Sequence, residues 1–454
     1  MTVAVRGATA AVAAAIATGS PTGTALVSQT AHEFTELDSG VRVVTEVLPS
    51  VRSAALGFFI GTGSRTELSG QAGLSHLLEH LIFRGSASHT SLEIDQIFDG
   101  MGAELNAGTG KEATSVFSRV LDRHVPRAFE VMADMIWRPA FEDVDAERQV
   151  VLEEIAMYED DPQDKVFDVL GEAVFGDDPL GRPIIGRAAV IADTPLAEIA
   201  AFHRGRYVPG NVVVAAAGSV KHDEIVALVE ATMPDASAPL TAPPGSPPVT
   251  CEPRVCFERK DTEQYHVCLG GLGIARDDDR RFALRLLDNI LGGTSSSRLF
   301  QEIRERRGLA YSVHSFSSLY AGTGQVGLYV GTRPENLIEA MGVVGEELER
   351  MQDTAATAAE LDRSKENVKG RLVLALESTG MRMNRLGSSL LSDMPVLSVD
   401  EMIERIDAVT LDDLAELARE LFPVTRLSAA GVGTEPARFR DALAGVSPEL
   451  AEAA

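Results

Sequence analysis

The chain of 454 residues has few cysteines and no long apolar run. Its three cysteines, Cys251, Cys256 and Cys268, are an odd set in one stretch. They offer neither a disulfide framework nor a set of zinc ligands, so we expect buried free thiols. No apolar span reaches the roughly 18 residues of a membrane helix. The length exceeds one ordinary hydrophobic core and favours a two-domain protein.

Positive charge is also scarce in this sequence. There are 41 Lys and Arg residues against 67 Asp and Glu residues, which gives a formal net charge of −26. Phosphate backbones and anionic lipids repel such a chain, so we expect neither nucleic acid nor a membrane as a partner. The acidity is compatible with basic peptide segments as substrates, and equally with a role in solubility alone.

The first 30 residues lack the marks of a secretion signal. They are rich in Ala, Thr, Ser and Gly, with one arginine, Arg6, and a weak apolar stretch over 8–17. A secretion signal has a positive cluster followed by a strongly hydrophobic middle. We therefore predict a disordered leader over 1–30 and a cytoplasmic protein, with a targeting segment as the alternative.

Proline indicates where the chain divides. Residues 236–250 hold so much proline that neither a helix nor a central strand can form there. A semi-extended linker of this length typically joins two independent lobes. We predict one domain at 31–235 and a second at 251–445.

The most informative motif is H-x-x-E-H, formed by His76, Glu79 and His80. On a helix, residues three and four apart share one face. Two imidazoles at this spacing can bind one Zn²⁺, and the carboxylate beside them can act on a water at the metal. The order is typical of one class of zinc peptidase. The alternative is a half-buried histidine beside the apolar face of Leu77 and Leu78.

A catalytic zinc needs a third protein ligand and keeps a fourth position for water. Residues 142–161 predict one acid-rich helix with apolar positions such as Val151 and Ile155. Glu147 and Glu154 are seven residues apart, two helical turns, and so point the same way. Glu154 is therefore the candidate third ligand.

These residues together resemble the pitrilysin-like, or M16, zinc metallopeptidases, and the likeness extends from about residue 36 to about residue 430. The resemblance implies a zinc metalloendopeptidase with one Zn²⁺ per chain on His76, His80 and Glu154. It makes Glu79 the general base. It also makes Glu147 an outer acid that orients a ligand and raises its basicity.

The same resemblance assigns residues that hold the substrate. Asn106 and Ala107 would lie on an edge strand that pairs with the peptide backbone. An ordinary hairpin with Asn106 in its turn is the alternative. Arg304 and Tyr311, seven apart in the second half, would reach the zinc site and hold the peptide there. Alternatively, Arg304 is one more solvated helix charge.

The two halves of the chain look alike. Residues 52–85 and 264–293 each predict a strand, a loop and a helix. When Leu77 is aligned with Leu286, the motif residues His76, Glu79 and His80 fall on Arg285, Asp288 and Asn289. The second half therefore repeats the helix without the metal ligands, as expected of a duplicated domain that became a scaffold or substrate clamp.

The expected fold is α+β. The resemblance implies two homologous lobes, each a mostly antiparallel sheet packed with helices, which face one another across a chamber. Apolar periodicity predicts helices over 332–352, 360–392 and 400–422. The family's usual arrangement for chains of this length is a homodimer.

The expected function is zinc-dependent cleavage of peptides or of unfolded or precursor protein segments, with Glu79 moving the proton. Acids after the third ligand, among them Asp164 and Asp168, suggest a subsite for Arg or Lys. A charged helix face is the alternative for these acids. Two other functions stay open: a non-catalytic or partner-dependent assembly subunit, and a degrader of short peptides. Glu79 argues against the first, because a structural zinc site would not need it.

Overall fold

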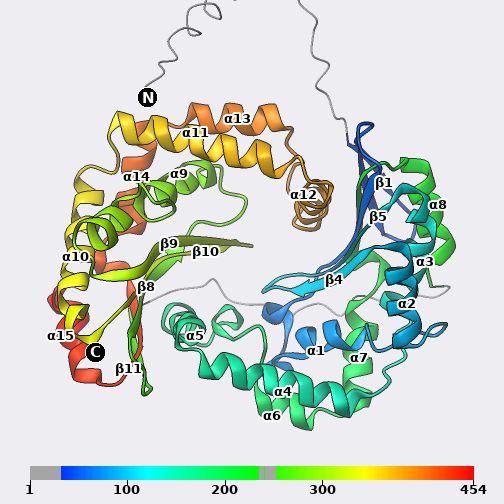
Figure 1. Ribbon diagram of the computed structural model, residues 1–454, viewed down its shortest axis with the longest axis horizontal. Helices are drawn as coiled ribbons and strands as arrows, with labels where there is room; N and C mark the ends of the chain where they lie inside the picture. Colours follow the sequence, from blue (N-terminus) through cyan, green and yellow to red (C-terminus); the bar gives the residue numbers. More distant parts are fainter. Residues whose placement is uncertain (1–31, 235–239, 241–251, 454) are drawn as a thin grey trace, which may run out of the picture. The chain divides into compact units, whose positions relative to one another are not determined.

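The first half of the chain builds a six-stranded sheet in the order β1-β2-β6-β3-β5-β4 (Figure 1). The computed structural model describes residues 32–234, 240 and 252–453. β2 and β6 pair in parallel, and the other neighbours pair antiparallel. The strands are β1 Glu33–Glu36, β2 Arg42–Val47, β3 Ser53–Ile60, β4 Glu104–Thr109, β5 Thr114–Leu121 and β6 Val212–Gly218.

Eight helices belong to this half of the described chain. They are α1 Leu74–Leu81, α2 Ser91–Met101, α3 Val125–Trp137, α4 Val144–Asp160, α5 Pro162–Phe175, α6 Ala188–Asp193, α7 Leu196–Arg206 and α8 His222–Thr232. The apolar stripes of α1, α3, α7 and α8 meet one face of the sheet in a single core. Phe58 of β3 packs there on Phe129 of α3, with ring centroids 5.0 Å apart.

The second half repeats this sheet. Its strands are β7 Val255–Arg259, β8 Tyr265–Gly273, β9 Ala310–Tyr320, β10 Thr323–Thr332 and β11 Ser428–Gly433. Their order, β7-β11-β8-β10-β9, matches β2-β6-β3-β5-β4, and β7 and β11 are again the parallel pair. The predicted α+β fold of two similar lobes is confirmed.

The helices of the second half, apart from α12, pack on one face of this sheet. They are α9 Arg281–Leu291, α10 Leu337–Asp353, α11 Ala358–Ala375, α12 Thr379–Leu391, α13 Val399–Ala408, α14 Leu411–Leu421, α15 Pro436–Leu443 and α16 Pro448–Glu452. A π-helix, Phe300–Arg306, precedes β9.

The predicted helices of the second half were too long. The helix predicted over 360–392 is two helices, because α11 packs on α9 whereas α12 crosses to the first sheet, so the chain turns at 376–378. The helix predicted over 400–422 breaks at Val409, where Thr410 caps α14 by accepting a hydrogen bond from the backbone N–H of Asp413. The helix predicted from 332 begins at Leu337, after the end of β10 and a 3-10 turn that starts with Pro334.

Each lobe supplies one helix to the other lobe's sheet. α12 packs on β2, β3 and β6, where Met383 and Leu386 meet Phe59. α5 packs on β7, β8 and β11, against Cys268 and Tyr329. Successive strand residues point to opposite faces, so Phe58 meets the helices of its own lobe and Phe59 meets α12. Both faces are thereby covered, which explains why β3 is apolar almost throughout.

Several sequence expectations concern other parts of the chain. The predicted leader 1–30 and the predicted linker 236–250, apart from Leu240, lie outside the described residues. Cys251 also lies outside the described residues. Cys256 and Cys268 carry free thiols, as predicted, but only Cys268 is fully buried and Cys256 is half-buried. Burial raises the pKa of both thiols. None of the described helices combines the length and the apolar character needed to cross a bilayer.

The contact between α12 and β3 generates a stability prediction. A Cβ at Gly387 would lie 2.1 Å from Cε2 of Phe59, whose side chain is itself buried. Gly387→Ala should therefore lower the free energy of unfolding by about 1–3 kcal/mol, as overpacking does. Denaturant titration monitored by circular dichroism measures this change.

Gly380→Ala in the same helix is the matched control. Its Cβ would meet only Ser378 Oγ at 3.6 Å, an ordinary contact. It should leave stability unchanged or raise it by up to about 1 kcal/mol through helix propensity. Equal effects of the two substitutions would contradict the close packing of α12 on β3.

Candidate active site

Helix α1 presents the H-x-x-E-H residues on its open face. Leu74, Leu77, Leu78 and Leu81 are fully buried and hold the helix on the core. His76, Glu79 and His80 are left on the other side, where His76 and Glu79 line a cavity of about 500 Å³. The three motif residues therefore share one face of α1, as their spacing in the sequence predicts.

A buried acid, Glu67, fixes the start of α1. The carboxylate of Glu67 accepts hydrogen bonds from the backbone N–H groups of Gly73 at 2.8 Å and Ser75 at 2.7 Å. Gly73 has φ +101°, a left-handed conformation that favours glycine. Burial raises the pKa of Glu67 to about 7, against the effect of these hydrogen bonds. No periodicity or motif marks Glu67.

Helix α4 brings Glu154 to the two histidines. Its Oε2 lies 3.6 Å from His76 Nε2 and 3.4 Å from His80 Nε2. With zinc–ligand bonds of about 2.0–2.1 Å, a tetrahedral ion would separate its ligand atoms by roughly 3.3–3.4 Å. The three atoms therefore fit one zinc ion. In the part of the chain that the structure describes, this is the one group of three or more His, Cys, Asp or Glu side chains so arranged.

The protonation of His76 suits a metal ligand. Burial, and next the charge of His80, lower the pKa of His76 to about 4. The imidazole is therefore neutral at pH 7, as a ligand must be. The two imidazole rings meet edge to face, with centroids 4.7 Å apart.

Glu147 orients His80. Its side chain is almost fully buried, and one oxygen lies 2.8 Å from Nδ1 of His80. That contact leaves Nε2 of His80 free to face Glu154. A carboxylate that accepts the Nδ1–H in this way fixes the tautomer of a histidine whose Nε2 binds a metal. Arg84 pairs with the other oxygen of Glu147. Arg84 follows His80 by four residues, a helical spacing that could have indicated it from the sequence.

Glu79 is held by the neighbouring strand. Thr109 at the end of β4 donates a hydrogen bond of 2.6 Å to Oε2 of Glu79. The phenol of Tyr207 is buried near this carboxylate, and burial followed by the charge of Glu79 raises its pKa. Neither Thr109 nor Tyr207 was selected from the sequence, although Thr109 lies two residues after the predicted Ala107 in β4 and therefore on the same face of the strand.

Asp164 and Asp168 of α5 line the same cavity as His76, Glu79 and Glu154. Burial raises the pKa of both carboxyls. For Asp168, Lys111 and Lys165 oppose this rise. The second lobe closes this cavity with Phe316, Ser318 and Gln325.

Asn106 and Ala107 lie within β4, at the edge of the first sheet. Within the described chain β4 pairs only with β5, so its other edge carries no strand. The side chain of Asn106 accepts a hydrogen bond of 2.8 Å from the N–H of Ala107. The turn between β4 and β5 comes later, at 110–113, so Asn106 is a strand residue.

Arg304 and Tyr311 are not brought into this cavity. The Arg304 guanidinium lies 4.4 Å from the ring centroid of Tyr311 and 4.7 Å from that of Phe300. The Tyr311 side chain is 78% exposed. Neither Arg304 nor Tyr311 lines the cavity that contains His76 and Glu154.

Two family models match the chain. The model described as Insulinase (Peptidase family M16) covers residues 42–188, and the model described as Peptidase M16 inactive domain covers residues 195–368. The first range contains the metal-site residues, and the second contains α9.

Curated relatives extend along nearly the whole chain. A protein of Streptomyces coelicolor named an uncharacterized zinc protease is 42% identical over 423 residues, 90% of this chain and 92% of the relative. A protein so named from Mycobacterium tuberculosis is 42% identical over 405 residues, covering 88% and 92%. Another from Bacillus subtilis is 39% identical over 386 residues, covering 85% and 94%.

Solved structures share the fold. A peptidase M16 inactive domain from Pseudomonas fluorescens superimposes with a TM-score of 0.81 over 89% of this chain and 98% of that one, at 23% identity. A protease from Helicobacter pylori gives a TM-score of 0.82 over 89% and 99%, also at 23% identity. With zinc protease relatives over most of its length and a site that fits zinc, the chain belongs to peptidase family M16 as a metallopeptidase.

Proposed function

We propose that this chain is a zinc-dependent endopeptidase that holds one Zn²⁺ on His76, His80 and Glu154 and uses Glu79 as its general base. The observation that carries the proposal is the position of Glu79, whose carboxylate shares one cavity with two of the three ligands. A structural zinc site would have no use for this fourth group. Bound zinc would act as a Lewis acid and lower the pKa of a water toward neutrality.

Glu79 would move the proton. Thr109 donates to Oε2 of Glu79 and so fixes the orientation of the carboxylate. An oriented carboxylate can accept a proton from the attacking water and pass it to the leaving amine. Tyr207 and the buried core beneath α1 keep solvent from the rear of this group.

The substrate would bind as an added strand. The free edge of β4 around Asn106 and Ala107 would offer backbone groups to an added strand, and Thr109 of the same strand bonds Glu79. Main-chain hydrogen bonds of this kind bind extended peptides with little regard to sequence. Peptides and unfolded segments are therefore the proposed substrates.

The first test compares wild-type protein with Glu79→Gln on a pooled peptide library, with zinc measured on both. Glu79→Gln should keep its zinc, since His76, His80 and Glu154 are unchanged. It should lose at least about 100-fold in kcat/KM, the usual scale of a general base. Glu153→Gln removes an exposed acid of α4 and should change neither quantity. A wild type that binds zinc and cuts no peptide would favour an assembly subunit.

The acids of α5 would select a basic residue near the cut. Asp164 and Asp168 line the cavity, and their charge suits an Arg or Lys side chain. Because burial raises both pKa values, this preference should weaken as the pH falls from neutral, at a higher pH than ordinary aspartates would give. Precursor processing and peptide degradation both remain compatible with such a site.

The double variant Asp164→Asn/Asp168→Asn tests this subsite. It should lower the ratio of kcat/KM for basic over neutral peptides by about tenfold, the value of one charge-assisted hydrogen bond. Asp95→Asn, an exposed acid on α2, should leave the ratio as it is. A ratio that the double variant does not change would mean that these acids form only a charged helix face.

A homodimer would give Arg304 and Tyr311 a role. An exposed tyrosine stacked on an arginine is typical of a protein interface. Because neither residue lines its own metal cavity, we place the pair of one copy over the active site of a second copy. In a two-fold dimer the exchange would be reciprocal.

Subunit mixing tests this arrangement. Glu79→Gln and Tyr311→Phe should each be nearly inactive as homodimers. When the two variants are refolded together, about half of the dimers should contain one chain of each kind. Such a dimer has one complete site of two, so about one quarter of wild-type activity should return. A mixture of Glu79→Gln and His76→Ala should recover nothing, because both lesions affect the same lobe. No recovery in the first mixture would mean that Tyr311 acts within its own chain or not at all.

A further inference from the structure

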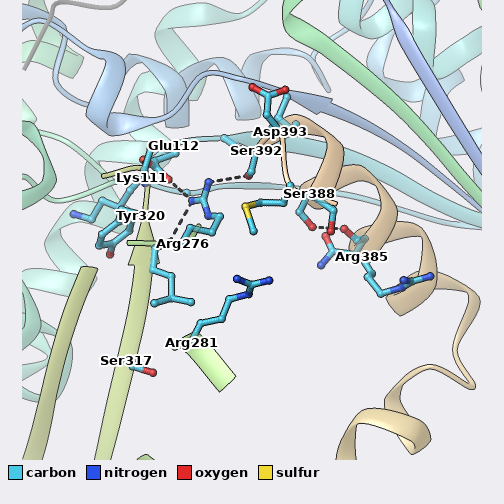
Figure 2. Close-up of a pocket in the computed structure, with 18 of the residues that line it drawn as sticks. Lys111, Glu112, Arg276, Arg281, Ser317, Tyr320, Arg385, Ser388, Ser392 and Asp393 are labelled. Atoms are coloured by element: carbon cyan, nitrogen blue, oxygen red, sulfur yellow. Dashed lines mark hydrogen bonds and ion pairs between the residues drawn. The ribbon is translucent and has the colours of Figure 1, made fainter. Parts of the chain in front are cut away.

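A second cavity, larger than that of the active site, lies between the two lobes and is rich in positive charge. Its volume is about 1470 Å³, and both halves of the chain line it. Figure 2 shows Arg276 and Arg281 pointing into it. Three carboxylates line the cavity: Glu112, Asp288 and Asp393. Seven cations line it: Arg65, Lys111, Arg276, Arg281, Arg285, Arg371 and Arg385.

This excess of positive charge in the cavity is opposite in sign to the net charge of the chain. The chain carries a net charge of −26, and the active-site cavity has four carboxylates against one lysine. Charges of one sign that collect in a concave site raise the local concentration of the opposite ion. The cavity therefore favours an anionic ligand.

The cationic cavity includes the second lobe's copy of the metal centre. Asp288 of α9 accepts a hydrogen bond from Ser315 on the edge strand β9, as Glu79 of α1 does from Thr109 on the edge strand β4. Asn289 donates to Asn367 of α11 at 3.0 Å, in the place where His80 contacts Glu147 of α4. These matching contacts support the alignment of Arg285 with His76. An arginine thus stands where the first lobe has a metal ligand.

Two of the seven cations form no hydrogen bond or salt bridge within the described chain. Arg65 and Arg276 share Glu112, Arg281 pairs with Asp279, and Arg385 pairs with Glu46. Lys111 donates to a backbone carbonyl. In contrast, Arg285 on α9 and Arg371 on α11 make no hydrogen bond or ion pair within the described chain, and both side chains are exposed to the cavity. Arg285 acts on the neighbouring Asp288 only through its charge, which opposes the rise that burial causes in the pKa of this carboxyl. The carboxylate of Asp288 itself accepts a hydrogen bond from Ser315.

We propose that Arg285 and Arg371 bind a carboxylate of the peptide substrate. A guanidinium presents a planar fork of N–H donors that matches a carboxylate, so two arginines that line one cavity and form no salt bridge can act as a receptor for this group. Lys111 lines both cavities, so one peptide can extend from the acids Asp164 and Asp168 to the arginines. The inference rests on the proposed peptidase function and makes the enzyme selective for a peptide with a basic residue near the cut and a carboxylate at a distance from it.

The test uses peptides that share one cleavable core taken from the library experiment. One peptide has no acidic residue and an amidated C-terminus, and a second differs only in having a free C-terminal carboxylate. The others have an amidated C-terminus and a single glutamate, placed at varied distances before or after the cleavable core. Wild-type protein should prefer at least one carboxylate-bearing peptide by about tenfold in kcat/KM, through a lower KM. The preferred member shows whether the carboxylate comes from the chain end or from a side chain.

The variant Arg285→Gln/Arg371→Gln should reduce that preference to within about twofold, as should high salt, which screens the attraction. A ratio between two peptides is insensitive to a uniform loss of activity from poor folding. The matched control Arg204→Gln/Arg363→Gln removes two exposed arginines outside the cavity and should keep the preference. No wild-type preference, or one that survives in Arg285→Gln/Arg371→Gln, overturns the proposal.

Binding to Glu79→Gln separates this proposal from the proposed function. Fluorescence anisotropy with the same labelled peptides should give tighter binding of the carboxylate-bearing member, and this difference should disappear when Arg285→Gln/Arg371→Gln is added. If no peptide is cut by the wild type but arginine-dependent binding remains, the peptidase function fails and the carboxylate site stands. If peptides are cut with no arginine-dependent discrimination, the peptidase stands and the carboxylate site fails.

Discussion

The exchange of one helix between the lobes is the constraint on which the rest of the structure depends. α12 covers the free face of the first sheet and α5 covers that of the second. Glu46 of β2 is completely buried and is satisfied only because Arg382 and Arg385 of α12 pair with it. A buried carboxylate left without such partners would be strongly destabilising. The two lobes therefore cannot separate without exposing two apolar faces and one charge.

This exchange also builds the active site. α5 follows α4 directly, with Asp161 capping its start, so the helix that carries Glu154 continues into the helix that packs on the second lobe. The candidate metal ligands are thereby tied to both sheets. Asp164 and Asp168 reach the cavity for the same reason, since they lie in the first turns of α5. The same packing lets the second lobe contribute Phe316 to the wall of the metal cavity.

Duplication has given the two lobes one framework and two chemistries. Each has a helix after its central strand, an acid on that helix bonded to a hydroxyl of an edge strand, and a second helix beside it. The first lobe places His76, His80 and Glu154 there, a group that could hold a metal ion, and the second places arginines and amides. A substrate that lies against both would meet a site that attracts cations and one that attracts anions.

Sequence alone determined the donor set of the site. The spacing of His76, Glu79 and His80, and the seven-residue interval from Glu147 to Glu154, are local helical properties, so they could be predicted, as could the repeated strand and helix of each half. Only the tertiary structure decided that Arg84 would hold Glu147, that Glu67 would anchor α1, and where α11 would stop and α12 begin. The tertiary structure also decided that Arg304 and Tyr311 lie outside the cavity lined by His76, Glu79 and Glu154. The reason is physical: periodicity reports which residues share a face, whereas the neighbour that meets this face depends on the packing of segments distant in the chain.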